Sequence, residues 1–253
     1  MSLKVIDPEE NSQPQGPDQV PDDDGRTVVA QHAFPYFTIV IIAALAAVYL
    51  FQNTTGFENS FDVADANNRL IRNGQYWRLV TGNTMHGFFW HIALNCMALY
   101  SLGSAIELLS NRAHLAIVFL FAAVGGSVMS ALLLPEINSV GASGGILGLA
   151  GYLTVYGYKR RRLLPPGFLK NMLINLAIVA GMGVIGYLYI DNAAHLGGFL
   201  VGAIYGLIQI PKDLYEDPRK VDVVTAVMGY ATLAAFISFA TLTILLLTKK
   251  IAL

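Results

Sequence analysis

Long apolar segments alternate with shorter polar connections along this chain. Most of the apolar segments approach the ~20 residues that a helix needs to cross the hydrocarbon core of a bilayer. The pattern therefore predicts seven membrane-crossing helices and an all-α fold. The seven segments lie at about residues 35–52, 88–109, 114–134, 142–158, 168–190, 193–210 and 223–248.

The composition agrees with a membrane protein. Hydrophobic residues make up 55% of the 253 residues and charged residues only 13%, and the mean hydropathy is +0.53. These values are too apolar for a soluble domain. The net charge of −1 argues against a nucleic-acid partner. The single cysteine, Cys96, excludes an internal disulfide.

The polarity of the chain predicts three parts. Residues 1–33 are polar, acidic and contain proline, so we expect a disordered cytoplasmic tail. Residues 34–210 hold six of the apolar segments and form the expected core. Residues 211–253 are expected to be a linker followed by a seventh transmembrane helix.

Basic residues predict how the chain is oriented, because they are enriched in cytoplasmic loops. The run Lys159–Arg162 follows the fourth segment, and Lys212, Arg219 and Lys220 follow the sixth. Both connections should therefore be cytoplasmic, as should the N-terminus. The longest connection, 53–87, mixes polar and apolar residues, and we expect it to form short helices at the membrane interface.

The fourth and sixth segments are short and rich in glycine. Gly144 and Gly148 recur four residues apart in one segment, as do Gly198, Gly202 and Gly206 in the other. Each set places small residues on one helix face, which lets the backbones of neighbouring membrane helices come close.

A serine and a histidine stand at the start of these two segments, Ser143 in the fourth and His195 in the sixth. Both side chains are costly in lipid unless each has a partner. The predicted topology lets both helices enter from the same membrane face, so the two residues should meet at similar depth. A serine beside a histidine is the minimal unit of an activated nucleophile. The sequence therefore predicts a serine hydrolase with its site inside the bilayer.

The second segment adds further polar residues. His91 and Asn95 are four residues apart and share one helix face. His86 precedes His91 by five residues, about 140° around a helix, so the two should not bind one metal ion. Polar side chains in a spanning helix indicate a function or a polar partner. Mutual hydrogen bonding that ties this segment to its neighbours remains an alternative explanation.

Several motifs together resemble one family. In order and spacing, the chain is similar to the rhomboid intramembrane serine proteases across about residues 70–210, and a seventh helix would make a six-plus-one arrangement that this family contains. The motifs that carry the resemblance are Trp77-Arg78, His86, His91-x-x-x-Asn95, Gly141-Ala142-Ser143-Gly144 and Ala194-His195-x-x-Gly198.

The resemblance implies a role for each residue. Ser143 would be the nucleophile and His195 the general base and acid. His91 and Asn95, with the Ser143 backbone N–H, would form the oxyanion hole. Asp191, four residues before His195, is expected to have no catalytic role, and no metal or cofactor is expected. Supporting roles would fall to His86, Trp77, Arg78, Gly141 and Gly198.

The same resemblance implies that transmembrane proteins are cleaved within or near the bilayer, with membrane lipid as the other partner. The expected location is a prokaryotic plasma (inner) membrane, crossed several times. Three alternatives remain open at this stage. They are a transporter or channel, a haem protein that uses His91 and His195 as axial ligands, and an inactive relative of the same fold.

Overall fold

The computed structural model describes residues 34–55, 57–187, 189–213 and 215–250, and the backbone of three strands before them. These strands are β1 (Leu3–Ile6), β2 (Gln19–Pro21) and β3 (Thr27–Ala30). They form an antiparallel sheet in the order β1-β3-β2. They depart from the disorder expected for residues 1–33, and their β-branched valines suit extended backbone. The rest of that segment lies outside the described residues, where disorder stays a prediction.

All seven apolar segments are helices, so the predicted all-α membrane architecture is confirmed. Five of them, α1, α5, α6, α8 and α10, are long and apolar enough to cross a membrane. The other two, α7 and α9, are the glycine-rich segments. The helices are α1 (Tyr36–Thr54), α5 (Phe89–Leu109), α6 (Arg112–Leu133), α7 (Ser143–Lys159), α8 (Phe168–Ile185), α9 (Asn192–Gln209) and α10 (Val223–Leu247).

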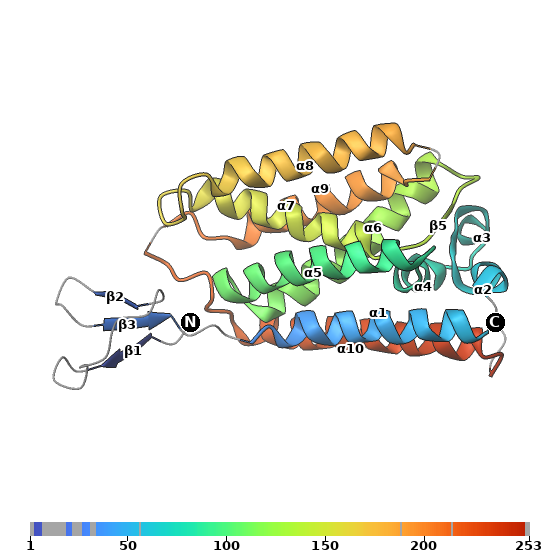
Figure 1. Ribbon diagram of the computed structural model, residues 1–253, viewed down its shortest axis with the longest axis horizontal. Coiled ribbons are helices and arrows are strands. Elements are labelled where there is room, and N and C mark those ends of the chain that lie inside the picture. The colour runs from blue at the N-terminus through green and yellow to red at the C-terminus, as the bar shows by residue number, and fades with distance from the viewer. Residues whose placement is uncertain are drawn as a thin grey trace.

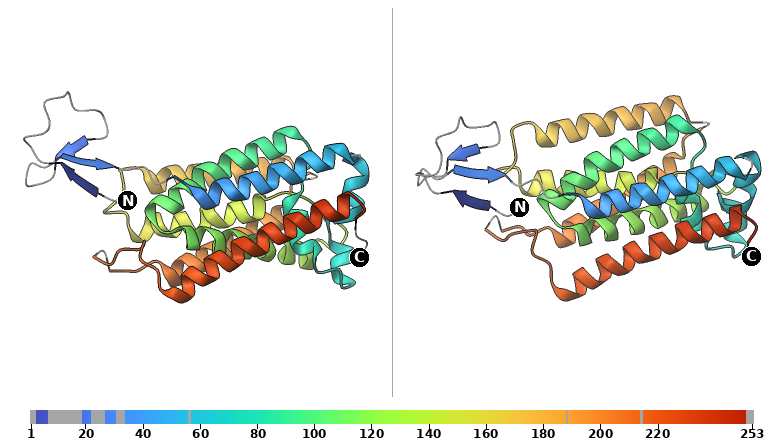
Figure 2. Two further views of the ribbon diagram at one scale, coloured as in Figure 1. Left: turned by 90° about the horizontal axis from the view of Figure 1, so that it is seen from below. Right: turned by 60° about the horizontal axis from the view of Figure 1, so that its bottom comes forward.

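The helices lie side by side as a bundle (Figure 1). Helices α6, α7 and α9 pack against one another at its centre, while α8 packs on α7 at one side. At the opposite side α10 packs against α6 and α1. The seventh helix therefore covers the face of the core that is remote from α8, as Figure 2 also shows.

Glycine permits the close approach of α7 and α9. A Cβ atom on Gly198 would overlap the backbone of Gly144, and one on Gly202 would overlap the backbone of Gly148. On the other side of α7, a Cβ on Gly145 would come within 2.9 Å of the Phe119 ring. The small-residue faces predicted from the sequence thus meet each other directly.

The long connection between α1 and α5 folds into short helices, as predicted. These are α2 (Phe57–Ala64), α3 (Asn68–Arg72) and α4 (Arg78–Thr84), and between them β4 (Ala66–Asn67) pairs with β5 (Asn138–Ser139). All of them gather at one end of the bundle (Figure 1), here called the α4 end. Their location at a membrane interface stays a prediction.

The buried side chain of Arg78 holds this connection together. Its guanidinium donates to the Asp65 carboxylate at 2.7 Å and to the carbonyl oxygens of Asp65 and Asp62 at 2.9 Å. The Arg78 and Asp65 side chains are only 6% and 3% exposed. Arg78 is therefore a structural clamp within the connection. Trp77 packs beside it, in the apolar cluster that joins α4 to α10.

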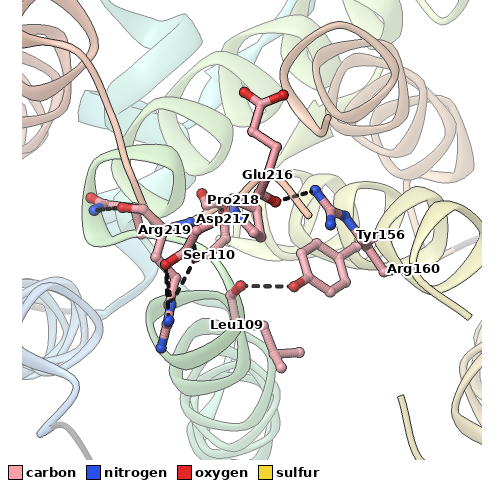
Figure 3. Close-up of polar contacts among 9 residues, drawn as sticks. Leu109, Ser110, Tyr156, Arg160, Glu216, Asp217, Pro218 and Arg219 are labelled. Carbon is pink, nitrogen blue, oxygen red and sulfur yellow. Dashed lines mark hydrogen bonds and ion pairs between the residues drawn. The ribbon is translucent and has the colours of Figure 1, made fainter. Parts of the chain in front are cut away.

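At the other end of the bundle, the linker from α9 to α10 is bound to the core (Figure 3). The Arg160 guanidinium, at the end of α7, donates to the Glu216 carbonyl oxygen at 2.8 Å. The Asn111 amide, at the start of α6, donates to the Arg219 carbonyl oxygen at 2.9 Å. The seventh helix is consequently fastened to the six-helix core through its linker as well as by packing.

Candidate active site

Ser143 and His195 lie within hydrogen-bond distance. Ser143 is the first residue of α7 and His195 lies in the first turn of α9. The Ser143 Oγ and His195 Nε2 atoms are 2.8 Å apart. The glycine contact between Gly144 and Gly198, one turn deeper, holds the two helices close enough for this bond. The structure thus brings together the two residues that the sequence analysis paired.

The Asp191 carboxylate is occupied by hydrogen bonds at the start of α9. Its carboxylate accepts the Ala194 backbone N–H at 2.9 Å and the Ser130 hydroxyl at 2.5 Å. The His195 backbone N–H donates to the Asp191 carbonyl oxygen at 3.1 Å. Asp191 therefore caps the helix that carries His195. That the carboxylate takes no part in the chemistry stays a prediction.

Gly141 is required by its backbone conformation and by a neighbouring ring. Its φ is +125°, a region that side chains with a Cβ rarely adopt. Its N–H donates to the Gly82 carbonyl oxygen at 3.0 Å, which ties the loop before α7 to α4. A Cβ here would lie 2.7 Å from the Nε2 and Cε1 atoms of His91. Glycine therefore lets the His91 ring reach the residues just before Ser143.

His91 and Asn95 present nitrogen atoms to the same place. The Cβ position of Gly141 is 2.7 Å from His91 Nε2 and 3.6 Å from Asn95 Nδ2. The Gly87 backbone N–H donates to His91 Nδ1 at 3.4 Å, so Nε2 is the ring nitrogen that is available to donate. Within the described part of the chain, the buried Asn95 Nδ2 has no hydrogen-bond partner. The alternative of a mutual His91–Asn95 hydrogen bond is thus not what this geometry favours.

The start of α7 offers a further donor. The first four N–H groups of an α-helix have no partner within the helix, and Ser143 opens α7. The positive end of the α7 dipole adds to the attraction for negative charge. Ser143, His91 and Asn95 all line one cavity, and donors from these three residues would suit a developing oxyanion.

His86 lies behind His91 rather than beside the dyad. It is fully buried, and its backbone N–H donates to Gln52 Oε1 at 3.1 Å. Its ring meets the His91 ring edge-on, with 5.1 Å between centroids. His86 thus supports the His91 ring through packing. Among the described residues no three His, Cys, Asp or Glu side chains group as metal ligands.

A cavity of about 680 Å³ opens from the dyad. It runs between α5 and α8 with α7 as its floor, and its wall includes all four predicted site residues: Ser143, His195, His91 and Asn95. Two polar wall residues, Ser101 and Asn175, had no role in the sequence analysis. The signal that would have drawn attention to Asn175 is an uncharged amide within an otherwise apolar spanning segment.

The haem alternative loses support from the same contacts. Haem ligation by His195 through Nε2 would need that atom free, but it is engaged with Ser143.

Comparison with known proteins gives consistent matches. Residues 73–212 match the family model of the Rhomboid domain. Rhomboid protease GluP of Bacillus subtilis is 30% identical over 178 residues, which cover 69% of this chain and 35% of GluP. RHOMBOID-like protein 6, mitochondrial, of Arabidopsis thaliana is 33% identical over 162 residues, 60% of this chain and 50% of that protein.

A third relative is covered over more of its own length. Rhomboid protease AarA of Providencia stuartii is 26% identical over 210 residues, 68% of this chain and 72% of AarA. The chain spans about a third of the length of GluP and half that of RHOMBOID-like protein 6. The family model covers more than half of this chain and includes the helices that carry Ser143 and His195. This multi-pass membrane protein therefore belongs to the rhomboid family.

Proposed function

We propose that this chain is an intramembrane serine endopeptidase that cleaves transmembrane proteins within or near the bilayer with a Ser143–His195 dyad. The observation that carries the proposal is the 2.8 Å approach of Ser143 Oγ to His195 Nε2 at the wall of a cavity between membrane helices. Its relatives GluP and AarA are named as rhomboid proteases, which supports the same reaction class.

The dyad performs both halves of peptide hydrolysis. Ser143 Oγ attacks the scissile carbonyl carbon while His195 Nε2 takes the hydroxyl proton. His195 then donates that proton to the leaving amine, and the peptide C–N bond breaks to leave an acyl-enzyme. A water molecule attacks the ester as His195 removes its proton. Return of the proton to Ser143 Oγ releases the second product and restores the enzyme.

The oxyanion of each tetrahedral intermediate is stabilised by the Ser143 N–H, His91 Nε2 and Asn95 Nδ2. The Asn95 amide supports this assignment, because a buried donor without a partner costs free energy that an arriving oxyanion recovers. Helix α5 is a rigid mount for His91 and Asn95, so the donors need little rearrangement during the reaction. His86 and Gly141 act as positioning residues for the His91 ring.

The α4 end faces the outside of a prokaryotic plasma membrane, and the N-terminus is cytoplasmic. The basic run at the opposite end of α7 supports this orientation. Within this run, the Lys159 ammonium is bound to the end of α9, because it donates to the Leu207 and Ile210 carbonyl oxygens at 2.6 and 2.7 Å. Arg161 and Arg162 remain exposed and carry the orientation signal.

The activity is tested with pure protein in liposomes that contain a single-spanning reporter protein. The wild type should release the reporter fragment, and a fluorophosphonate probe should label Ser143. The variant Ser143→Ala should do neither. Ser238→Ala on α10 should behave as wild type, because among the residues that the structure describes its hydroxyl bonds only to the Ala234 carbonyl of its own helix. Undiminished cleavage by folded, pure Ser143→Ala would refute the proposed mechanism.

The orientation is tested with single cysteines in a Cys96→Ser background. Asn73→Cys at the α4 end should react with an impermeant thiol reagent added to intact cells, whereas Arg161→Cys should react only after lysis. Both positions are exposed in the structure, so burial does not explain a difference. The reverse pattern would overturn the orientation.

A further inference from the structure

Two polar side chains on the cavity wall take no part in the mechanism above. Ser101 lies on α5 and Asn175 on α8, and both line the cavity that opens from the dyad. In the described part of the chain, neither side chain makes a hydrogen bond to the protein. Most of the wall around them is apolar, including Ala98, Leu102 and Leu176. Both residues are exposed, so a serine on α5 and an asparagine on α8 lie open on the wall of one mainly apolar cavity.

Both residues lie at one depth, well below the dyad. Ser101 follows His91 by ten residues along α5, and Asn175 precedes Ile185, the last residue of α8, by ten. Because a helix rises 1.5 Å per residue, each lies about 15 Å from the α4 end of the bundle. The hydrocarbon core is about 30 Å thick. Ser101 and Asn175 thus lie near the middle of the bilayer.

Unpaired polar groups at this depth are costly for the fold. Lipid tails offer no hydrogen bond, and a polar side chain in a spanning helix marks a functional contact by default. Among the described residues neither group bonds to a neighbouring helix, so no hydrogen bond of the fold depends on it. A partner that brings its own polar side chain to this depth would satisfy both groups.

We propose that Ser101 and Asn175 form a mid-membrane subsite that binds a polar side chain in the transmembrane segment of the substrate. This inference rests on the proposed protease activity and adds a selection rule to it. The occupant is an uncharged hydrogen-bonding residue such as Asn, Gln, Ser or Thr. Asn175 supplies a donor pair and an acceptor, and Ser101 supplies a hydroxyl that does both. The apolar wall around Ser101 and Asn175 packs against the apolar side chains of the substrate's transmembrane segment.

The distance to the dyad sets the position of that residue in the substrate. A span of about 15 Å is covered by about ten residues of helix or about five of extended chain. The substrate is extended at the scissile bond and runs into the membrane from there. The recognised polar residue should therefore lie about five to ten residues from the scissile bond, on the side that enters the bilayer.

The test compares two reporter substrates in liposomes that differ at a single position. One has Gln and the other Leu in the transmembrane segment, with the position scanned from five to ten residues beyond the cleavage site. A single hydrogen bond between membrane helices is worth a factor of about 3 to 20. Wild-type protein should favour the Gln reporter in kcat/KM by a factor in that range at one or two adjacent positions.

Variants assign the preference to the subsite. Asn175→Leu should bring the Gln-to-Leu ratio close to one by slowing cleavage of the Gln reporter alone, and Ser101→Ala should lower the ratio in part. Asn175→Gln should restore some preference. Asn171→Leu is the matched control, because this exposed asparagine lies one turn away on α8 and outside the cavity wall. It should leave the ratio unchanged.

The outcomes separate the two proposals. If wild-type protein cleaves neither reporter, the proposed protease activity fails. If it cleaves both but shows no preference at any scanned position, or if Asn175→Leu retains the preference, the subsite is refuted while the protease activity stands. An equal loss of kcat/KM for both reporters in Asn175→Leu would also overturn the subsite, because it indicates a structural role only.

Discussion

Replacing Gly198 with alanine should separate the dyad without touching either reacting residue. Gly198 lies three residues after His195 on α9 and contacts Gly144, the neighbour of Ser143 on α7. A methyl group here would overlap the Gly144 carbonyl oxygen and lie 2.7 Å from its carbonyl carbon. That oxygen belongs to the backbone of a packed helix, so rotation of a side chain cannot relieve the overlap.

The size of the effect follows from these distances. Carbon atoms that are not bonded prefer a separation of about 3.5–4.0 Å, so α9 must move away from α7 by about 1 Å near this contact. The Ser143–His195 distance of 2.8 Å would then grow to roughly 3.8 Å, beyond the range of a hydrogen bond. A misplacement of 1 Å at a reacting centre costs about 10²-fold in rate. We expect Gly198→Ala to lower kcat by about that factor.

The assay needs two further glycine variants as controls. In the part of the chain that the structure describes, Gly181 on α8 has no atom within 4 Å of its Cβ position. Gly181→Ala should therefore keep full activity and should gain about 0.5–1 kcal/mol in stability. For Gly206, further along α9, the three atoms nearest to a Cβ would be side-chain atoms of Val155, Tyr152 and Ile210 at 3.2–3.3 Å. Gly206→Ala should therefore have an intermediate effect.

Cleavage of the reporter and the rate of fluorophosphonate labelling are both measured, together with the thermal unfolding midpoint. The two rates should fall together in Gly198→Ala while the protein remains folded at the assay temperature. Wild-type turnover in a folded Gly198→Ala protein would refute the reasoning that the α7–α9 glycine contact sets the dyad distance. A loss in Gly181→Ala as large as that in Gly198→Ala would refute it too, since steric overlap would not be the cause.

Three further outcomes are expected. Replacing either oxyanion donor, in His91→Ala or Asn95→Ala, should lower kcat by about 10²–10³-fold with KM little changed; steady-state kinetics that show only a change in KM would contradict the assignment. Asp191→Ala should destabilise the protein by about 1 kcal/mol through the lost helix cap and reduce activity less than either donor variant does, whereas a loss as large as that of a dyad variant would give Asp191 a direct role. Arg78→Ala should cost about 3–5 kcal/mol, because it leaves the Asp65 carboxylate buried and unpaired; a midpoint of unfolding equal to that of the wild type would show that the clamp is dispensable.

The sequence alone predicted the helices, and it predicted that Ser143 and His195 should meet, as they do in the structure. Apolar segments long enough to cross a bilayer have few alternatives to a helix, because backbone groups in lipid must be satisfied within the segment. The regular glycine spacing indicated that the segments bearing Ser143 and His195 can approach closely. The polar residues within the predicted membrane helices indicated a function, because an unpaired polar group costs free energy among apolar ones. These are local properties, so they can be read along the chain.

Only the tertiary structure decided what each polar group faces. Asp191 and His195 are close in sequence, yet Asp191 caps a helix while the His195 ring reaches across to Ser143. The sequence analysis gave Arg78 only a supporting role, and the fold makes it a buried clamp on Asp65. Ser101 and Asn175 carried no signal as a pair, since they come from helices distant in the chain. The depth of a polar side chain in the membrane, the direction in which it points and the group that it contacts all depend on how the helices pack. Packing brings together residues that are far apart in the sequence.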